Sequence, residues 1–157
     1  AKSGGDDRCK KNHEHVQQVA ATEGLQFNFE KQKISPNTRN AHRLIWFAGQ
    51  KGSQGSANEA LMKAYFTDGV DLTQTDRLIE IGIQQGLSRE DTVRLFEYSE
   101  GLAEVEVAEK LSQQRGINGV PFFIINNRYG LSGAQPTEAF KKVFEEVATT
   151  PESEAKK

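Results

Sequence analysis

The side chains of this chain that could support thiol or metal chemistry are few and lie close to its start. The 157 residues contain one cysteine, Cys9, with His13 and His15 shortly after it. Cysteine and histidine are zinc ligands, but a structural zinc site takes four ligands, and this polar segment offers three. A single cysteine also excludes an internal disulfide. We therefore expect neither a metal site nor a redox-active cysteine pair among these residues.

A second group of candidate residues surrounds a proline near the C-terminal end. The segment GINGVPFFIINNRYGLSGAQPTEAF (116–140) places Gly119, Val120 and Pro121 directly before four large apolar residues. A proline cannot donate to the ladder of a sheet, so it belongs at the start or edge of a strand. A cis Val120-Pro121 bond would turn the Val120 main-chain groups outward, where they could pair with an extended substrate. Only about 5–6% of X-Pro bonds are cis in folded proteins, so spacing alone favours a plain strand-start proline.

Ala134 and Gln135 form a further candidate group because they come just before Pro136 and a helical pattern. Main-chain N–H groups at the N-terminus of a helix attract anions. The alternative is an ordinary turn between a strand and a helix, in which Gly133 supplies the required geometry.

Helical patterns occupy most of the chain before residue 116. Apolar residues recur there every three to four positions, which is the period of an amphipathic helix. Ser56 with Glu59, and Ser88 with Asp91, have the spacing of a capping box at a helix N-terminus. We expect helices at about 12–23, 41–48, 57–65, 75–85 and 101–115, and another after Ser88.

Other segments have different patterns. Residues 25–34 alternate apolar and polar residues, which predicts either a paired strand or an unpaired extended segment. Residues 1–11 are polar and predict a frayed start or a cap region. Residues 121–132 predict two short strands joined by a tight turn at Asn126 and Asn127. Pro136 fits the first turn of a final helix.

The overall charge excludes some classes of partner. The net charge is −2, so the chain has no basic field that would attract nucleic acid or a membrane surface. No apolar run approaches the roughly 20 residues that a membrane-spanning helix requires. We expect partners that are neither nucleic acid nor membrane.

The quoted segments together resemble one family. Residues 116–140 are similar to the C-terminal part of DsbA-like thiol oxidoreductases, and they look most like the FrnE-type branch. That branch is related to 2-hydroxychromene-2-carboxylate isomerases and kappa-class glutathione transferases. PNTRNAHRLIWFAG (36–49), LMKAYFTDGVDL (61–72) and EGLAEVEVAEKLSQQRGINGVPFF (100–123) resemble the helical insertion of the same branch. The resemblance covers about residues 12–148.

The resemblance implies an α+β, mostly helical, thioredoxin-like fold with an all-helical insertion. Residues 1–112 would form the insertion, 113–148 the C-terminal half of the thioredoxin-like domain, and 149–157 a disordered tail. It also implies that the loop at Val120 and Pro121 is a cis-proline loop that contacts the thiol or peptide of a partner.

The resemblance implies further site residues. In glutathione-using relatives, the turn that matches Ala134 and Gln135 helps to hold a carboxylate of the tripeptide. In isomerase-like relatives, the stretch that matches Asn37 and His42 lies beside the active cleft. The alternatives are an ordinary turn, a helix cap for Asn37, and a histidine on an exposed helix face for His42.

The chain departs from the family pattern at the residues that carry the chemistry. Family members begin with a strand that ends in a CxxC motif at a helix N-terminus, where the pKa of the first thiol is lowered. Nothing in this sequence corresponds to that motif, and Cys9 has no CxxC partner. We expect the first βαβ unit and its cysteine pair to precede Ala1, so that these 157 residues form an inactive fragment on their own.

The expected function of the parent protein is therefore thiol–disulfide exchange with protein substrates, of the DsbA/FrnE type. One alternative is a glutathione-dependent isomerase or transferase, in which a serine or a lone cysteine replaces the pair. Another is a non-catalytic thioredoxin-like module that binds peptides or a partner. We expect no cofactor, and glutathione would be a substrate. An exposed strand edge would favour a homodimer, and the cysteine-poor, acidic composition favours the cytoplasm.

Overall fold

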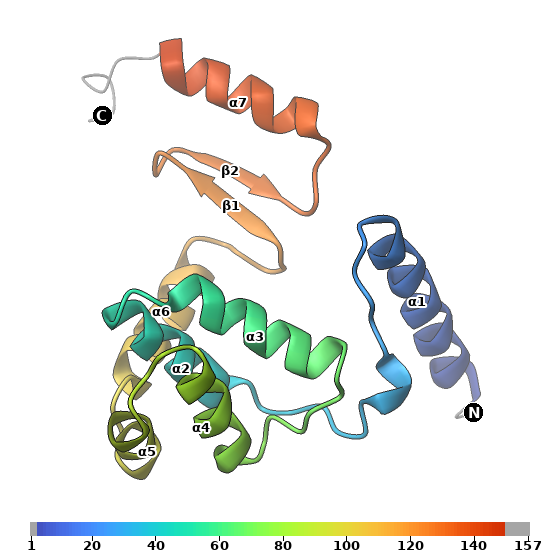
Figure 1. The fold of residues 1–157 in the computed structure, drawn as a ribbon. Coiled ribbons are helices and arrows are strands. Elements are labelled where there is room, and N and C mark those ends of the chain that lie inside the picture. Colours follow the sequence, from blue (N-terminus) through green and yellow to red (C-terminus); the bar gives the residue numbers. More distant parts are fainter. Residues whose placement is uncertain (1–2, 150–157) are drawn as a thin grey trace. The chain divides into compact units, whose positions relative to one another are not determined.

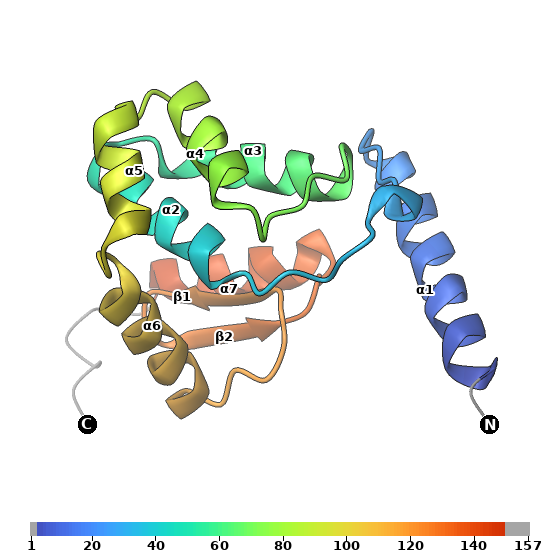
Figure 2. The same cartoon turned by 90° about the horizontal axis from the view of Figure 1, so that it is seen from below.

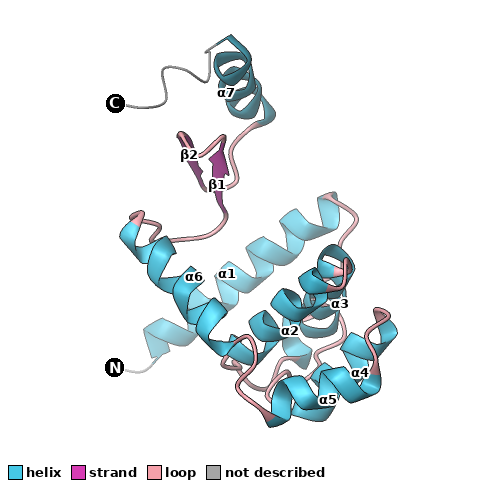
Figure 3. Cartoon of the chain, turned by 90° about the vertical axis from the view of Figure 1, so that its left-hand side faces the viewer, coloured by secondary structure: helices cyan, strands magenta, loops and turns pink. Residues whose placement is uncertain are grey.

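A computed structural model of the chain describes residues 3–149, with side chains described from Lys10 onward. The chain is mostly helical and has a small two-stranded sheet (Figures 1 and 3). It divides into two compact units, residues 1–107 and 108–157, and the division falls within helix α6. In the described residues, no helix is both long enough and apolar enough to cross a membrane.

The first unit consists of helices. Its elements are α1 (Ser3–Thr22), a short 3-10 helix (Phe29–Lys31), α2 (Arg39–Gln50), α3 (Gln54–Phe66), α4 (Thr75–Gln84), α5 (Arg89–Glu97) and the first part of α6 (Leu102–Gln114). Helix α2 contacts α3, α4 and α5, and these four helices lie beside one another in Figures 1 and 2.

The core of this unit forms where the apolar faces of α2, α4 and α5 meet. Leu44, Leu78 and Leu95, one from each of these helices, are 0% exposed. Gly82 of α4 permits the close packing, because a Cβ atom there would lie 3.0 Å from Leu44 Cδ1 and 3.1 Å from Thr92 Cγ2. Burial of each leucine side chain contributes about 1.5–3 kcal/mol to folding, so this contact fixes the arrangement of the three helices.

Arg43 of α2 is a buried charge that the sequence patterns did not indicate. Its Nε donates to the Glu100 carbonyl oxygen (2.8 Å), and its Nη1 donates to Asn40 Oδ1 (3.0 Å). Its Nη2 donates to the carbonyl oxygens of Tyr98 (2.6 Å) and Leu95. Burial lowers the pKa of Arg43 from its usual value, and the Glu100 carboxylate acts in the opposite direction. The guanidinium thus satisfies main-chain carbonyls at and beyond the end of α5.

The start of the chain differs from its prediction. Residues 3–11 continue α1 instead of forming a frayed start. Polar composition does not prevent a helix, because lysine and arginine have favourable helix propensities. Residues 25–28 belong to no helix or strand, and Phe29–Lys31 form a 3-10 helix, so neither predicted alternative, a paired strand or an extended segment, runs through residues 25–34. Asn28 holds this segment against the end of α3, since its N–H donates to the Phe66 carbonyl oxygen (2.7 Å).

Of the two predicted capping boxes, one is present in part, as the N-cap hydrogen bond of Ser88. The Ser88 hydroxyl accepts a hydrogen bond from the Asp91 N–H (3.1 Å) at the start of α5. The prediction that Ser56 caps its helix is wrong, because α3 already begins at Gln54 and Ser53 occupies the cap position. The Ser56 hydroxyl instead donates to the Ser53 carbonyl oxygen (3.1 Å).

The second unit contains the sheet. Strands β1 (Phe122–Ile125) and β2 (Tyr129–Ser132) pair antiparallel, and α7 (Thr137–Thr149) follows them. Asn126 and Asn127 form the predicted turn with φ values of 51° and 53°, a conformation that asparagine tolerates better than most residues. The ring of Phe123 meets Phe140 of α7 edge-on, with the centroids 4.9 Å apart. The tail predicted for residues 149–157 lies outside the described residues, except for Thr149, which ends α7.

Candidate functional site

The candidate site is the loop that leads from α6 into β1. Helix α6 ends in a Schellman motif, in which the Ile117 N–H donates to the Ser112 carbonyl oxygen (3.0 Å) and the Gly116 N–H to that of Gln113 (3.0 Å). Gly116 has a φ of 71°, a left-handed conformation that suits glycine. This motif stops the helix and directs residues 117–121 toward the sheet.

Val120 is the most exposed large apolar residue of the described chain, at 91% exposure. The Val120-Pro121 peptide bond is cis, as the family resemblance implied. Within the described residues, no hydrogen bond uses the Val120 N–H or carbonyl oxygen. The loop also contains no titratable side chain. It therefore offers main-chain pairing groups and one apolar side chain, which suits peptide binding and not acid–base catalysis.

Pro121 and the turn after β2 are brought together by the sheet. The Gly133 N–H donates to the Pro121 carbonyl oxygen (2.8 Å), which extends the β1–β2 pairing beyond Phe122 and Ser132. Ala134 and Gln135 follow directly and are exposed. Five of the six candidate residues, Gly119, Val120, Pro121, Ala134 and Gln135, thus belong to the same end of this unit.

The turn at Gln135 has a structural role of its own. The Gln135 amide donates from Nε2 to the Ser132 carbonyl oxygen (2.7 Å). Gly133 has a φ of 82°, so glycine supplies the geometry as the ordinary-turn alternative supposed. Helix α7 begins two residues later, at Thr137. Its first turn carries Glu138, whose carboxylate pairs with Lys141 Nζ (3.0 Å).

An apolar strand lies next to the loop. Phe123 and Ile124 of β1 are each 40% exposed, although strand residues of this type usually lie in a core. Gly130 of β2 makes room for the Phe122 ring, because a Cβ atom at Gly130 would lie 3.0 Å from Phe122 Cζ. The sequence reasoning missed this contact. A glycine inside a strand pattern is a signal of close approach that could have indicated it.

Asn37, the sixth candidate, lies in the first unit at the start of α2. Its Oδ1 accepts a hydrogen bond from the N–H of Arg39 (3.0 Å), the first residue of α2, while Thr38 occupies the cap position itself. It also lines a cavity of about 280 Å³ with Arg39, Asn40, Leu72 and Thr73. His42 is exposed on α2.

A charged group lies next to the Asn37 cavity. The Thr73 hydroxyl and N–H both donate to Asp71 Oδ1, at 2.7 and 2.9 Å, and these bonds hold the pKa of Asp71 below its usual value. The Asp71 carboxylate thus stabilises the turn before α4 in its ionised form, which does not suit it to donate a proton.

The residues with metal-like spacing, Cys9, His13 and His15, lie within α1. The His13 ring stacks on Phe29 with the centroids 4.4 Å apart. The side chain of Cys9 lies outside the described residues. Among the described residues, no group of three His, Cys, Asp or Glu side chains is placed to hold a metal ion.

Comparisons with known proteins agree with the fold. The sequence profile of the DSBA-like thioredoxin domain matches residues 3–145. The structure is similar to the crystal structure of a probable DsbA oxidoreductase from Streptomyces coelicolor, with a TM-score of 0.84 and 27% sequence identity. That match covers 92% of this chain and 63% of the crystallised chain, so the present chain spans less than two thirds of its relative. No curated protein matches the sequence.

Proposed function

Because the chain belongs to the family of DSBA-like thioredoxin domains, we propose that it is part of a thiol–disulfide oxidoreductase of the FrnE-type branch. The proposed substrates are protein thiols and disulfides. In such an exchange, a thiolate attacks one sulfur of a disulfide, a new mixed disulfide forms, and the other sulfur leaves as a thiolate. The reaction needs a nucleophilic thiol and a surface that aligns the substrate chain.

The exposed main chain of Val120 is the observation that supports this proposal. Its N–H and carbonyl oxygen take part in no hydrogen bond of the described residues, and its side chain is 91% exposed. An extended peptide can pair with such groups as an additional strand does. Gly119, Val120 and Pro121 would align the substrate main chain beside the reacting sulfurs, while the turn at Ala134 and Gln135 supports the loop through Gly133.

The nucleophile of the proposed reaction does not come from a pair within these residues. The chain contains Cys9 alone, so it cannot alternate between a dithiol and an intramolecular disulfide. We propose that the reactive pair belongs to residues of the parent protein outside this sequence. The 157-residue chain should therefore bind substrate peptides weakly and show no redox turnover.

A glutathione-dependent isomerase or transferase is the rival on the same fold. Such an enzyme would place a glutathione carboxylate near the start of α7. Glu138 already puts a carboxylate in the first turn of that helix, where it takes the favourable position in the helix dipole and engages Lys141, a nearby cation that could otherwise pair with a glutathione carboxylate. This charge supports protein substrates over glutathione.

The test compares the native parent protein with a variant of the same protein in which Val120 is replaced. Insulin-disulfide reduction with a dithiol supply should fall roughly tenfold or more in Val120→Glu, because the charge displaces the substrate chain from the reacting sulfur. Val107→Glu is the matched control, since Val107 is also an exposed valine (64%) and lies on α6. Both variants should keep the wild-type melting temperature.

Three results would contradict the proposal. They are an absence of dithiol turnover in the native protein, equal losses in Val120→Glu and Val107→Glu, and turnover by the 157-residue chain alone. Activity with glutathione and a small electrophile, in place of a protein disulfide, would favour the rival enzyme.

A further inference from the structure

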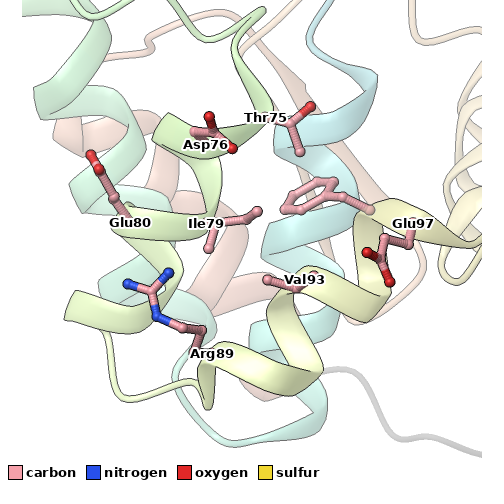
Figure 4. A pocket seen from close by; sticks show the side chains of 8 residues that line it. Thr75, Asp76, Ile79, Glu80, Arg89, Val93 and Glu97 are labelled. Atoms are coloured by element: carbon pink, nitrogen blue, oxygen red, sulfur yellow. The ribbon is translucent and has the colours of Figure 1, made fainter.

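A cavity of about 440 Å³ lies between α4 and α5, in the helical unit and separate from the loop at Val120 (Figure 4). Its apolar surface comes from Ile79 of α4 and from Val93 and Phe96 of α5. Ile79 is 9% exposed, and the other two side chains are half-buried. The core of the unit does not fully cover these three residues, so they offer an apolar contact area to a ligand.

Charged side chains surround this apolar area. Figure 4 shows Asp76, Glu80, Arg89 and Glu97 around the cavity, which gives three acidic groups and one basic group. Glu80 pairs with Arg77 Nη1 at 3.0 Å. In the part of the chain that the structure describes, no ion pair or side-chain hydrogen bond uses the carboxylates of Asp76 or Glu97.

The position of Glu97 has no explanation in helix stability. It is the last residue of α5, and a negative charge at a helix C-terminus is unfavourable. Asp76, in contrast, lies in the first turn of α4, where the dipole favours it. A cation between these two carboxylates would offset the unfavourable placement of Glu97.

The surrounding segment adds to the negative field. Residues 74–100 contain six acidic and three basic residues, which gives a net charge of −3, whereas the whole chain carries −2. The remaining residues therefore carry a net charge of +1. Lys51 and Arg43 offset part of this charge, at Asp91 and at residues 95–100. At the cavity itself, with Glu80 paired to Arg77, Asp76 and Glu97 outnumber Arg89, so the lining favours a cationic group over a phosphate.

We propose that this cavity binds a basic segment of a partner protein, with a lysine or arginine next to an aliphatic residue. The aliphatic residue and the methylene stem of the basic side chain would cover Ile79, Val93 and Phe96, as such stems do on apolar surfaces. The ammonium or guanidinium head would lie between Asp76 and Glu97. A polyamine matches the charge but has no side chain for the apolar area. The proposal does not depend on the redox function of the family.

The test measures fluorescence anisotropy of a labelled eight-residue peptide with alternating leucine and lysine, titrated with the full 157-residue chain. We expect binding that is tighter than that of a serine–lysine peptide and of a leucine–glutamate peptide of the same length. Asp76→Asn and Glu97→Gln should each raise the Kd by about threefold, which is the size of one exposed charge pair. Arg89→Gln should lower the Kd by about twofold, because it removes a charge of the same sign as the ligand.

Glu59→Gln is the matched control because Glu59 is an exposed carboxylate on α3 outside this cavity. It loses one negative charge, as Asp76→Asn and Glu97→Gln do, and should leave the Kd unchanged. Binding with no difference between the control and the cavity variants would overturn the proposal as non-specific charge attraction. Equal affinity for the serine–lysine peptide, tighter binding of the leucine–glutamate peptide, or no binding at about 1 mM chain would also overturn it. Unchanged melting temperatures would show that the variants are folded.

Discussion

Arg43 is the residue whose environment most constrains the helical unit. Its guanidinium is held by the carbonyl oxygens of Leu95, Tyr98 and Glu100 and by the Asn40 side chain. It also lies over the Phe96 ring, with 5.7 Å between the guanidinium carbon and the ring centroid. Arg43 is only 6% exposed and its bond to the Leu95 carbonyl oxygen is buried, so removal of the side chain leaves that oxygen poorly placed to bind water. One side chain of α2 therefore fixes the turn between α5 and α6.

Replacement of this residue tests that role. Arg43→Met keeps the apolar stem but leaves buried carbonyl oxygens without donors, and each such group costs about 1–3 kcal/mol. We expect the free energy of unfolding in urea to fall by about 3 kcal/mol. Arg77→Met is the control, because Arg77 forms an exposed ion pair with Glu80 and should cost less than about 1 kcal/mol. Equal losses in the two variants would show that the Arg43 bonds contribute little to stability.

The helices and turns of this chain agree with the sequence-based predictions where the sequence signals are local. Helix α4 covers Thr75–Gln84, close to the predicted 75–85, because its apolar period and its closing glycine lie within one segment. The Asn126-Asn127 turn was predicted for the same reason. The Arg43 contacts were not, since their partners lie 52 to 57 residues away in the sequence. The Ser56 cap prediction failed because α3 begins earlier, at Gln54, with Ser53 at the cap position and no side-chain cap hydrogen bond there.

A second role of glycine is to let two segments that are distant in the sequence pack closely, and Gly69 is the example. Gly69 has a φ of 70° and lies against the 3-10 helix of residues 29–31. A Cβ atom there would overlap Lys31 Cβ and would lie 3.0 Å from the Lys31 carbonyl oxygen. Gly86 has a similar φ of 88°, but nothing lies within 4 Å of the corresponding Cβ position. A comparison of Gly69 with Gly86 therefore separates the free-energy cost of the backbone conformation from the free-energy cost of packing.

Alanine substitution at both glycines measures this difference. Each variant loses about 1–2 kcal/mol because alanine disfavours the left-handed conformation. Gly69→Ala should lose a further 1 kcal/mol or so, because the main chain at Lys31 must move. Chemical denaturation of both variants provides the measurement. If the two substitutions destabilise the chain equally, the segment of residues 29–31 is free to move away from α3.

At the scale of the whole molecule, the core is concentrated in the helical unit. Among the residues whose side chains the structure describes, the fully or nearly buried apolar ones lie between Ala20 and Val105, and none of them belongs to β1, β2 or α7. The two-stranded sheet and α7 bury only part of Phe123, Ile124 and Phe144, which are 40%, 40% and 54% exposed. Strands with open edges and exposed apolar side chains favour association with another chain. The sequence predicted this sheet but could not predict how little of it is covered, because coverage depends on contacts across the fold.

The exposed strand leads to a prediction for the oligomeric state of the 157-residue chain. We expect sedimentation velocity to show reversible dimers at about 100 μM, formed through β1, because apolar area removed from water contributes about 25 cal/mol per Å². Ile124→Lys should shift the chain toward monomer, since a charge on a strand edge opposes pairing with a second chain. Val16→Lys is the matched control, as Val16 is a similarly exposed apolar residue (42%) on α1. If Val16→Lys disrupts the dimer and Ile124→Lys does not, the contact runs through α1, and the strand edge of β1 stays available for the substrate peptide that the Val120 loop is proposed to align.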